Sequence, residues 1–291
     1  MPMETHSFKR LVLGLQPGAS GRSMRLAVDF ADLLHLDLLG LLIDDTSVNK
    51  LANIPFAREF RPLGGGWHSI DPEQVSHEFE LATRSIQRML TEATGHLTTR
   101  YQFDIARGSP LDTITAVSRT DDIVMVAEPP SPGEHVTQQF TWLIQAAFRS
   151  AAAVVLVPRQ IARTKGPIVA IAASPSDPSI RVAATIAIAA KEDLIILDTC
   201  ETTMENRSIR ALAAELGLPI RHVVTGSTLR SHSTAFSPEY LPLQERLVVV
   251  TRGVFRNGEA STIAAARRVP VLVIEPMQAN RPPTSTERAT V

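Results

Sequence analysis

The sequence predicts an α/β fold made of two tandem, doubly wound, parallel five-stranded sheets. Short runs that are apolar at nearly every position alternate with helix-like stretches, which is typical of parallel strands covered on both faces. The same series of strand and helix signals occurs twice along the 291 residues, which indicates two copies of one unit. Right-handed crossovers between such strands give open sheets with helices on both sides.

Each copy begins with an apolar run bounded by turn-forming residues, at 9–15 and again at 166–172. A loop containing Pro and Ser then leads into a helix-like stretch, at 23–35 and 179–190. Three positions of these stretches are identical at one constant offset: Ser23, Arg25 and Ala27 match Ser179, Arg181 and Ala183. Ser20 precedes the first of these helices and is expected to cap it.

The remaining signals follow in the same order in both copies. They are second apolar runs ending in aspartate (36–44 and 192–198), Gly-Ser pairs (108–109 and 226–227), fourth-strand runs (122–127 and 246–251) and final runs (152–158 and 269–276). Chance explains one such match more readily than a whole series in one order. Each copy therefore reads as five strands alternating with helices.

The predicted domain boundary lies in the polar and basic segment 159–166, between two apolar runs. We expect a first domain over residues 1–160 and a shorter second domain over 166–276. Residues 277–291 are rich in Pro and Thr, a composition that predicts a disordered tail.

The first copy contains a long insertion, residues 45–95, between its second and third strands. Its second part predicts an amphipathic helix over about 72–95, with an apolar face made of Val75, Phe79, Leu81, Ala82, Ile86, Met89 and Leu90. The segment GGGWHS before it has two interpretations. It is either a lid over a pocket, with Trp67 stacking on a ring and His68 hydrogen-bonding, or a flexible loop with Trp67 packed back on the domain. The second copy has only a short helical stretch near 208–216.

Composition excludes several classes of protein. A formal net charge of −1 creates no overall field that attracts nucleic acid or an anionic membrane. The single cysteine, Cys200, excludes an internal disulfide framework and a cysteine-based zinc cluster, and the histidines are too dispersed to predict a metal site. No apolar run suits a signal core or approaches the ~18–20 residues of a membrane span. We therefore expect a cytoplasmic protein that binds neither nucleic acid nor membrane.

Taken together, these features resemble a tandem universal stress protein, with two UspA-type domains in one chain. The resemblance rests on the first-strand runs, the Gly-Ser pairs, the fourth-strand runs VMVA and VVVTRG and the closing segment RRVPVLVIEP, and covers most of residues 8–276. It implies a Rossmann-like, adenine nucleotide alpha hydrolase-like fold with strand order 3-2-1-4-5 in each domain. Many members of this family bind ATP between strands 1 and 4, at the topological switch point.

The family's nucleotide motif, G-x2-G-x9-G-[S/T] after the fourth strand, presents backbone amides to phosphates. In the first copy its positions fall on Ala127, Pro130, Phe140 and Thr141. Only the Thr141 hydroxyl fits, because the prolines at 129, 130 and 132 have no N–H and Glu128 adds negative charge. Gln16 occupies the place of the aspartate that the family carries at the end of its first strand.

The second copy keeps only an outline of the motif. Gly253 fits its first glycine, but the loop that follows is much shorter than the family's, and Ala173 stands at the aspartate position. Two interpretations stay open for this loop. Arg252 and Arg256 hold an anion together with the amides that begin at Gly258, at a helix N-terminus, or the segment is a short solvated turn with a glycine hinge.

Asp44 and Asp45 end the second strand, and paired carboxylates suggest acid–base or metal chemistry. Neighbours on an extended strand point in opposite directions, so a solvated strand end or a helix cap is the favoured interpretation. No nucleophile elbow, P-loop or metal motif is present, so we predict no catalytic residue and no metal ligand. The candidate ligand-binding residues, as a vestigial nucleotide site or an anion site, are Gln16, Asp44, Thr141, Arg252, Gly253, Arg256 and Gly258.

The leading hypothesis is a non-enzymatic protein of the universal stress type, without a cofactor, that acts in stress response or regulation by associating with an unknown protein partner. The alternative is a sensor of ATP, ADP, AMP or another small ligand at the switch point between strands 1 and 4. An enzyme related to this fold class is a third hypothesis, but no motif supports it. The final runs 151–157 and 269–275 are too apolar for exposed sheet edges. We therefore expect them to join the halves into an intramolecular pseudo-dimer, with further homodimerisation possible.

Overall fold

The computed structural model describes residues 8–17, 19–54, 56–61, 66–95, 100–128, 138–150, 153–199, 206–225, 242–255 and 259–276. The elements are, in chain order, β1 (Arg10–Leu15), α1 (Gly21–Leu33), β2 (Asp37–Asp45), α2 (Thr46–Ala52), β3 (Arg58–Arg61), β4 (Gly66–Ser69), α3 (Pro72–Thr94), β5 (Tyr101–Gly108), α4 (Pro110–Val117), β6 (Asp122–Ala127), α6 (Gln138–Arg149), β7 (Ala153–Val157), β8 (Ile168–Ala172), α7 (Pro178–Ala190), β9 (Leu194–Asp198), α8 (Asn206–Leu216), β10 (Ile220–Val224), β11 (Leu247–Thr251), α10 (Glu259–Arg267) and β12 (Val271–Ile274). Within these ranges, no helix has both the length and the apolar character needed to cross a bilayer.

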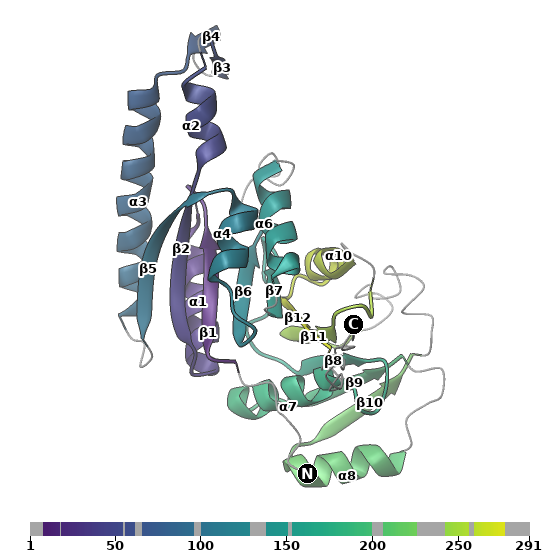
Figure 1. Cartoon of the computed structure of the whole chain (residues 1–291). Coiled ribbons are helices and arrows are strands. Elements are labelled where there is room, and N and C mark those ends of the chain that lie inside the picture. The colour runs from purple at the N-terminus through teal and green to yellow at the C-terminus, as the bar shows by residue number, and fades with distance from the viewer. Residues whose placement is uncertain are drawn as a thin grey trace, which may run out of the picture.

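One ten-stranded sheet runs through the whole molecule, in the order β10-β9-β8-β11-β12-β7-β6-β1-β2-β5 (Figure 1). Each half contributes the order 3-2-1-4-5 to this sheet, and its five strands pair in parallel within each half, which confirms the predicted fold class and strand order. The halves meet where β7 and β12 pair in antiparallel fashion, with Leu272 opposite Val155. The two predicted sheets are therefore one continuous sheet, joined through the two apolar final strands.

Two apolar cores lie on the two faces of this sheet, because alternate strand residues point to opposite sides. One core packs β1 residues such as Leu11 and Leu13 against α1, α3, α7 and α8. The other packs Val12 and its neighbours against α4, α6 and α10. Both cores continue across the β7–β12 joint, so burial holds the two halves together on both faces.

The long helix α3 confirms the prediction made for the insertion, and it packs on the domain from Phe79 onward. Ile86 and Leu90 are fully buried, and a Cβ on Gly40 of β2 would lie 2.6 Å from Leu90 Cδ2, so glycine makes room for the helix. Leu81 does not join this face as expected, because its side chain is 48% exposed. Phe79 packs against the core although it lies nearer the helix N-terminus. Leu81 comes two positions later, about 200° around the helix axis, so it points away from the packed face.

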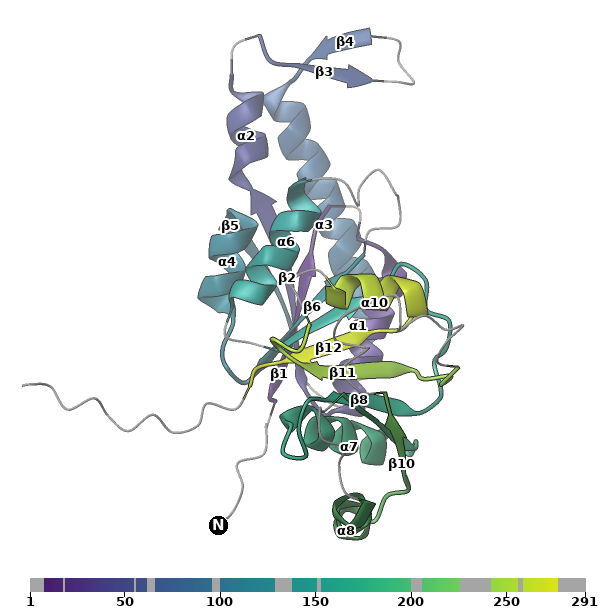
Figure 2. The same ribbon diagram turned by 90° about the vertical axis from the view of Figure 1, so that its right-hand side faces the viewer.

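The N-terminal part of α3, before Phe79, forms a projecting arm together with α2 and the two-stranded hairpin β3–β4. The arm rises from the end of β2, and the hairpin lies at its tip, well away from the sheet (Figures 1 and 2). Asp71 caps α3 at this tip by accepting a hydrogen bond from the Glu73 amide, and Pro72 occupies the first helical position. The second half has no such arm, since β9 connects to β10 through 199–219, of which α8 is the described helix.

A buried ion pair anchors the entry to the fourth strand in each half. In the first half, Arg10 binds both carboxylate oxygens of Asp122, at 2.6 and 3.1 Å, and this hydrogen bonding raises the pKa of Arg10. In the second half, Arg267 at the end of α10 binds both oxygens of the fully buried Glu245. Both halves therefore pair a buried carboxylate at the entry to the fourth strand with an arginine, but the two arginines come from different elements, β1 and α10.

Candidate functional site

The fold places two possible ligand sites at carboxyl ends of strands. In an open parallel sheet, ligands bind where neighbouring strands send their connections to opposite faces. These switch points lie between β1 and β6 in the first half and between β8 and β11 in the second.

At the first switch point, three described residues make backbone or capping contacts. The carbonyl of Gln16 accepts a hydrogen bond from the Ala19 amide at 3.0 Å, and Ser20 caps α1 as predicted by accepting from the Ser23 amide at 3.2 Å. Glu128 Oε2 accepts a hydrogen bond from the Arg159 amide at 2.9 Å. This contact fixes the backbone that follows β7. Thr141 lies exposed on α6, while the proline loop 129–137 falls outside the described residues.

Asp44 ends β2, next to the first switch point, and it is mostly buried. Its Oδ2 lies 3.2 Å from Nε of Arg107, the residue opposite it on β5. The carboxylate thus pairs with a neighbouring strand, which agrees with the interpretation as a strand end. Asp45 follows directly and precedes the start of α2.

At the second switch point, Arg252 bridges the two halves. Its Nη1 donates to the carbonyl of Phe148 in the last turn of α6 at 2.5 Å, and its guanidinium lies 5.5 Å from the centre of the Phe148 ring. Its Nη2 also lies 2.7 Å from Glu275 Oε1. A cation at the C-terminus of a helix is stabilised by the helix dipole. The guanidinium is therefore oriented toward protein groups from both halves.

The glycine-punctuated turn after β11 is described only in part. Gly253 has a φ of +92°, which favours glycine, and no atom lies near its missing Cβ. Arg256 and Gly258 lie outside the described residues, so their predicted role is not located. The helix α10 that follows begins with Glu259, whose negative charge already complements the helix N-terminus.

Asp177 is a buried carboxylate at the second switch point that the sequence analysis did not single out. It accepts hydrogen bonds from the amides of Ala173 and Ser179, at 2.8 and 3.0 Å, and from the Thr251 hydroxyl at 2.5 Å. These contacts tie the loop after β8 to the end of β11 and cap α7. The Asp-Pro-Ser sequence at 177–179 was the available signal, because it is typical of a helix start.

A second polar pair, also not predicted, lies on β9 and β10. Nε2 of His222 lies 3.2 Å from Oδ2 of the fully buried Asp198, and the Thr225 hydroxyl donates to the Asp198 carbonyl. The pair is typical of a structural contact at strand ends. In the part of the chain that the structure describes, no group of three or more His, Cys, Asp or Glu side chains suits a metal ion.

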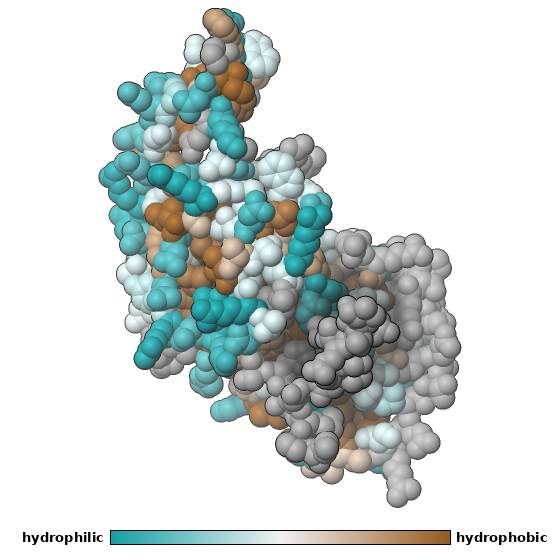
Figure 3. All heavy atoms as spheres, in the orientation of Figure 1, coloured by the Kyte–Doolittle hydropathy of each residue, from teal (hydrophilic) through white to brown (hydrophobic). Residues whose placement is uncertain are grey.

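The tip of the arm is the most exposed apolar surface among the described residues. Phe56 is 97% exposed, and Trp67 on β4 is 65% exposed while it packs against Phe60 on β3 with ring centres 5.5 Å apart. Leu51 and Ile54 are also about half exposed, and brown spheres gather near the upper end of the arm in Figure 3. Both interpretations of GGGWHS are therefore wrong for its described part, 66–69, because Trp67 neither covers a pocket in the domain nor packs back on it.

A hollow of about 380 Å³ lies beside this aromatic cluster. Its walls include Ile54, Phe56, Arg58, Ile70 and Pro72, which come from the segment that enters the hairpin β3–β4 and from the segment that leaves it. Phe56 is the aromatic residue of the tip that lines this hollow. Such a surface has the features of a protein contact, with apolar anchors next to a recess.

Comparison with known proteins gives a likeness of fold. No protein-family model and no curated protein matches the sequence. A universal stress protein from Archaeoglobus fulgidus superposes with a TM-score of 0.64 at 10% identity, over 94% of this chain and 98% of that one. A putative universal stress protein from Pseudomonas aeruginosa UCBPP-PA14 gives 0.52 at 13% identity, over 93% and 94% of the two chains. A functionally unknown protein from Pseudomonas aeruginosa PAO1 gives 0.51 at 13% identity, with the same coverage.

The chain therefore has the fold of universal stress proteins over nearly its full length. At these identities the likeness concerns the fold, and function has to be argued from the residues themselves.

Proposed function

We propose that the chain is a non-enzymatic, tandem protein of the universal stress type, with a regulatory or stress-response role exerted by binding a protein partner through the projecting arm. Its two halves act as a pseudo-dimer, and its nucleotide loops are degenerate. The observation that carries this proposal is the exposed aromatic tip formed by Phe56, Phe60 and Trp67. The pairing of β7 with β12 supports the pseudo-dimer, because each half covers the other's final strand.

Exposure at the tip is costly unless something covers it. An isolated two-stranded hairpin is marginally stable in water, and among the described residues β3–β4 pairs with no third strand. Aromatic residues are enriched at the centres of protein interfaces, where a few anchors carry most of the binding energy. Phe56 also adopts a φ of +71°, a conformation unfavourable for a bulky residue. Strain and exposure at one residue support a binding role for it.

The polar groups at the switch points support the absence of a phosphate site. Asp177 and Glu128 put carboxylates beside the two places where phosphates would lie, and Arg252 is directed toward Phe148 and Glu275. Calorimetric titration with Mg-ATP distinguishes this proposal from the alternative hypothesis, a nucleotide sensor at the switch point. We expect no binding tighter than about 1 mM. A micromolar affinity lost on mutation of 127–141 would favour the alternative.

The association itself is tested with tip variants of the full chain. Trp67→Ser and Phe56→Ser should abolish binding, whereas Tyr101→Ser, which changes an exposed aromatic residue on the edge strand β5, should preserve it. Sedimentation velocity over about 1–100 μM measures self-association. Quantitative pull-down from host extract, repeated with each variant, measures binding to another protein. The proposal fails if no association occurs, or if tip and edge variants lose it equally.

A further inference from the structure

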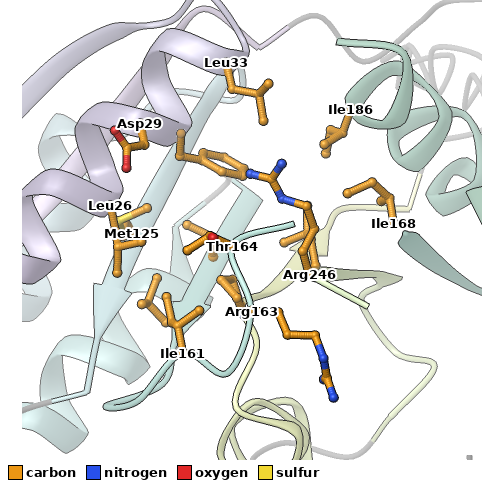
Figure 4. A pocket seen from close by; sticks show the side chains of 15 residues that line it. Leu26, Asp29, Leu33, Met125, Ile161, Arg163, Thr164, Ile168, Ile186 and Arg246 are labelled. Atoms are coloured by element: carbon orange, nitrogen blue, oxygen red, sulfur yellow. The ribbon is translucent and has the colours of Figure 1, made fainter. Parts of the chain in front are cut away.

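An apolar cavity of about 230 Å³ lies between the two halves, on the face of the sheet that carries α1 and α7. Side chains from both halves line it, including Leu33 of α1 and Ile186 of α7 (Figure 4). Its floor is formed by Met125 and by residues of β7 and β11. The cavity is separate from both switch points and from the arm, and the proposed function does not use it.

The cavity follows from how the halves are joined. Helices α1 and α7 pack mainly over the strands of their own halves, and the two final strands β7 and β12 meet between them. On this face the segment after β7 supplies the remaining wall, through Ile161 and Thr164. Because a loop covers this part of the joint, its side chains leave space that a packed helix would fill.

The size and lining of the cavity fit a small apolar group. Leu26, Phe30 and Leu33 of α1 are only half-buried, so they form apolar walls that remain open to a ligand. A dry cavity of about 150 Å³ lined by such side chains is large enough for benzene. The volume here therefore accommodates a single aromatic ring or a chain of about eight carbons.

One charged side chain, that of Arg246, extends into this apolar cavity (Figure 4). The Arg246 side chain extends across the cavity between α1 and α7, whereas the Arg163 side chain turns away from it (Figure 4). The Arg246 side chain is 27% exposed, and Nη1 lies 3.9 Å from Glu192 Oε1, which is beyond hydrogen-bond distance. The same Glu192 oxygen accepts a hydrogen bond from the Gly166 amide at 3.1 Å. The guanidinium thus keeps donors available for an anion, with the carboxylate of Asp29 on the α1 side of the rim.

We propose that this cavity binds a small amphipathic carboxylate, with its apolar body between α1 and α7 and its carboxylate on Arg246. Arginine binds carboxylates through paired N–H donors, and such charge-assisted bonds strengthen where water is excluded. The apolar walls select against small hydrophilic anions, because these gain nothing from the rest of the cavity. Since both halves line the site, bound ligand stabilises the joint between them.

The first test compares three ligands of the same chain length on the unmodified full chain. Isothermal titration should give binding of octanoate at least about tenfold tighter than that of 1-octanol, and no binding of octylamine. Octanoate should also shift the methyl signal of Met125, which lines the cavity, in a spectrum labelled at methionine methyls. Equal affinity for the acid and the amine, or an unchanged Met125 signal, would overturn the proposal.

The second test uses matched variants. Ile161→Trp should fill the cavity and reduce octanoate affinity at least about tenfold, while Ile188→Trp, at a half-exposed site on α7 outside the cavity, should not change it. Arg246→Met should reduce octanoate affinity to that of 1-octanol and leave the alcohol unaffected. Octanoate binding that survives both Ile161→Trp and Arg246→Met would contradict the proposal. If a variant does not fold, the ligand series on the unmodified chain decides.

Discussion

The two halves of this molecule share one sheet plan and differ in what they attach to it. Both arrange five parallel strands in the same order, and both bury a carboxylate at the entry to the fourth strand, Asp122 in one and Glu245 in the other. Between the second and third strands, however, the first half builds an arm from α2, β3–β4 and α3. The comparison shows that the core constrains the strand order. The connections outside the core tolerate insertions, so they can differ in structure and function between the halves.

The joint between the halves should be the most sensitive place in the molecule. Val271 of β12 is fully buried opposite Leu156 of β7, so Val271→Asp places an unpaired charge inside the sheet. We expect a loss of about 4 kcal/mol or more in the free energy of unfolding, measured by urea denaturation. Val224→Asp, at a half-exposed position of the edge strand β10, should cost less than about 1 kcal/mol. Similar losses for both would mean that the joint contributes little to the fold.

The two buried ion pairs offer a direct contrast between the halves. Arg267→Ala leaves Glu245 buried without its guanidinium, and we expect it to cost about 3–5 kcal/mol. Arg10→Ala should cost less, about 1.5–3 kcal/mol, because Asp122 still accepts from the Arg119 amide and Arg10 is partly exposed. Thermal and urea unfolding of the two variants measure the difference. A greater loss for Arg10→Ala would reverse this ranking of the halves.

A substitution of Arg252 measures how much polar contacts between the halves contribute to the stability of the fold. Arg252→Met removes the hydrogen bond to the Phe148 carbonyl and the contact with the Phe148 ring. We expect a loss of about 1–2 kcal/mol, since the group is partly exposed. The control Arg221→Met, on the exposed side of β10, should change unfolding by less than about 0.5 kcal/mol. An anion role for Arg252 would instead appear as weaker phosphate binding with unchanged stability.

The smallest effect on stability is expected at the tip of the arm. Phe56→Gly removes an exposed ring and relieves a positive φ, but it also increases the freedom of the unfolded chain. These terms oppose one another, so the free energy of unfolding should change by no more than about 0.5 kcal/mol. Partner association, measured in the same preparation, should nevertheless be lost. A large loss of stability would assign Phe56 a structural role instead.

Local signals made the sheet and the long helix predictable from sequence. Apolar runs such as 122–127 are enough to predict buried strands. The Gly108-Ser109 pair predicts the start of α4, where Ser109 caps the helix. The same reasoning was wrong at Leu81, because this residue lies about 200° around the helix axis from Phe79 and so falls outside the face that packs on the core. Strand order came from the resemblance, and the topology confirms it.

Features made by residues far apart in the chain were not predictable in this way. The Asp177–Thr251 hydrogen bond joins residues 74 positions apart, and the cavity brings Phe30 and Arg246 together from different halves. The sequence shows each residue type but not its neighbour in space. The direction of the arm likewise depends on the angle at which β2 passes into α2, which no short motif encodes (Figure 2).

The unequal connections have a consequence for stoichiometry. A dimer of two identical chains would present two copies of any projection, and could crosslink two partners. Here the β7–β12 joint links one half that has an arm to one half that does not. If the arm binds a partner as proposed, one chain is monovalent through it, so it would occupy or mask one partner and would not bridge two. Dilution cannot separate the two halves either, because the segment 159–166 keeps them in one covalent chain.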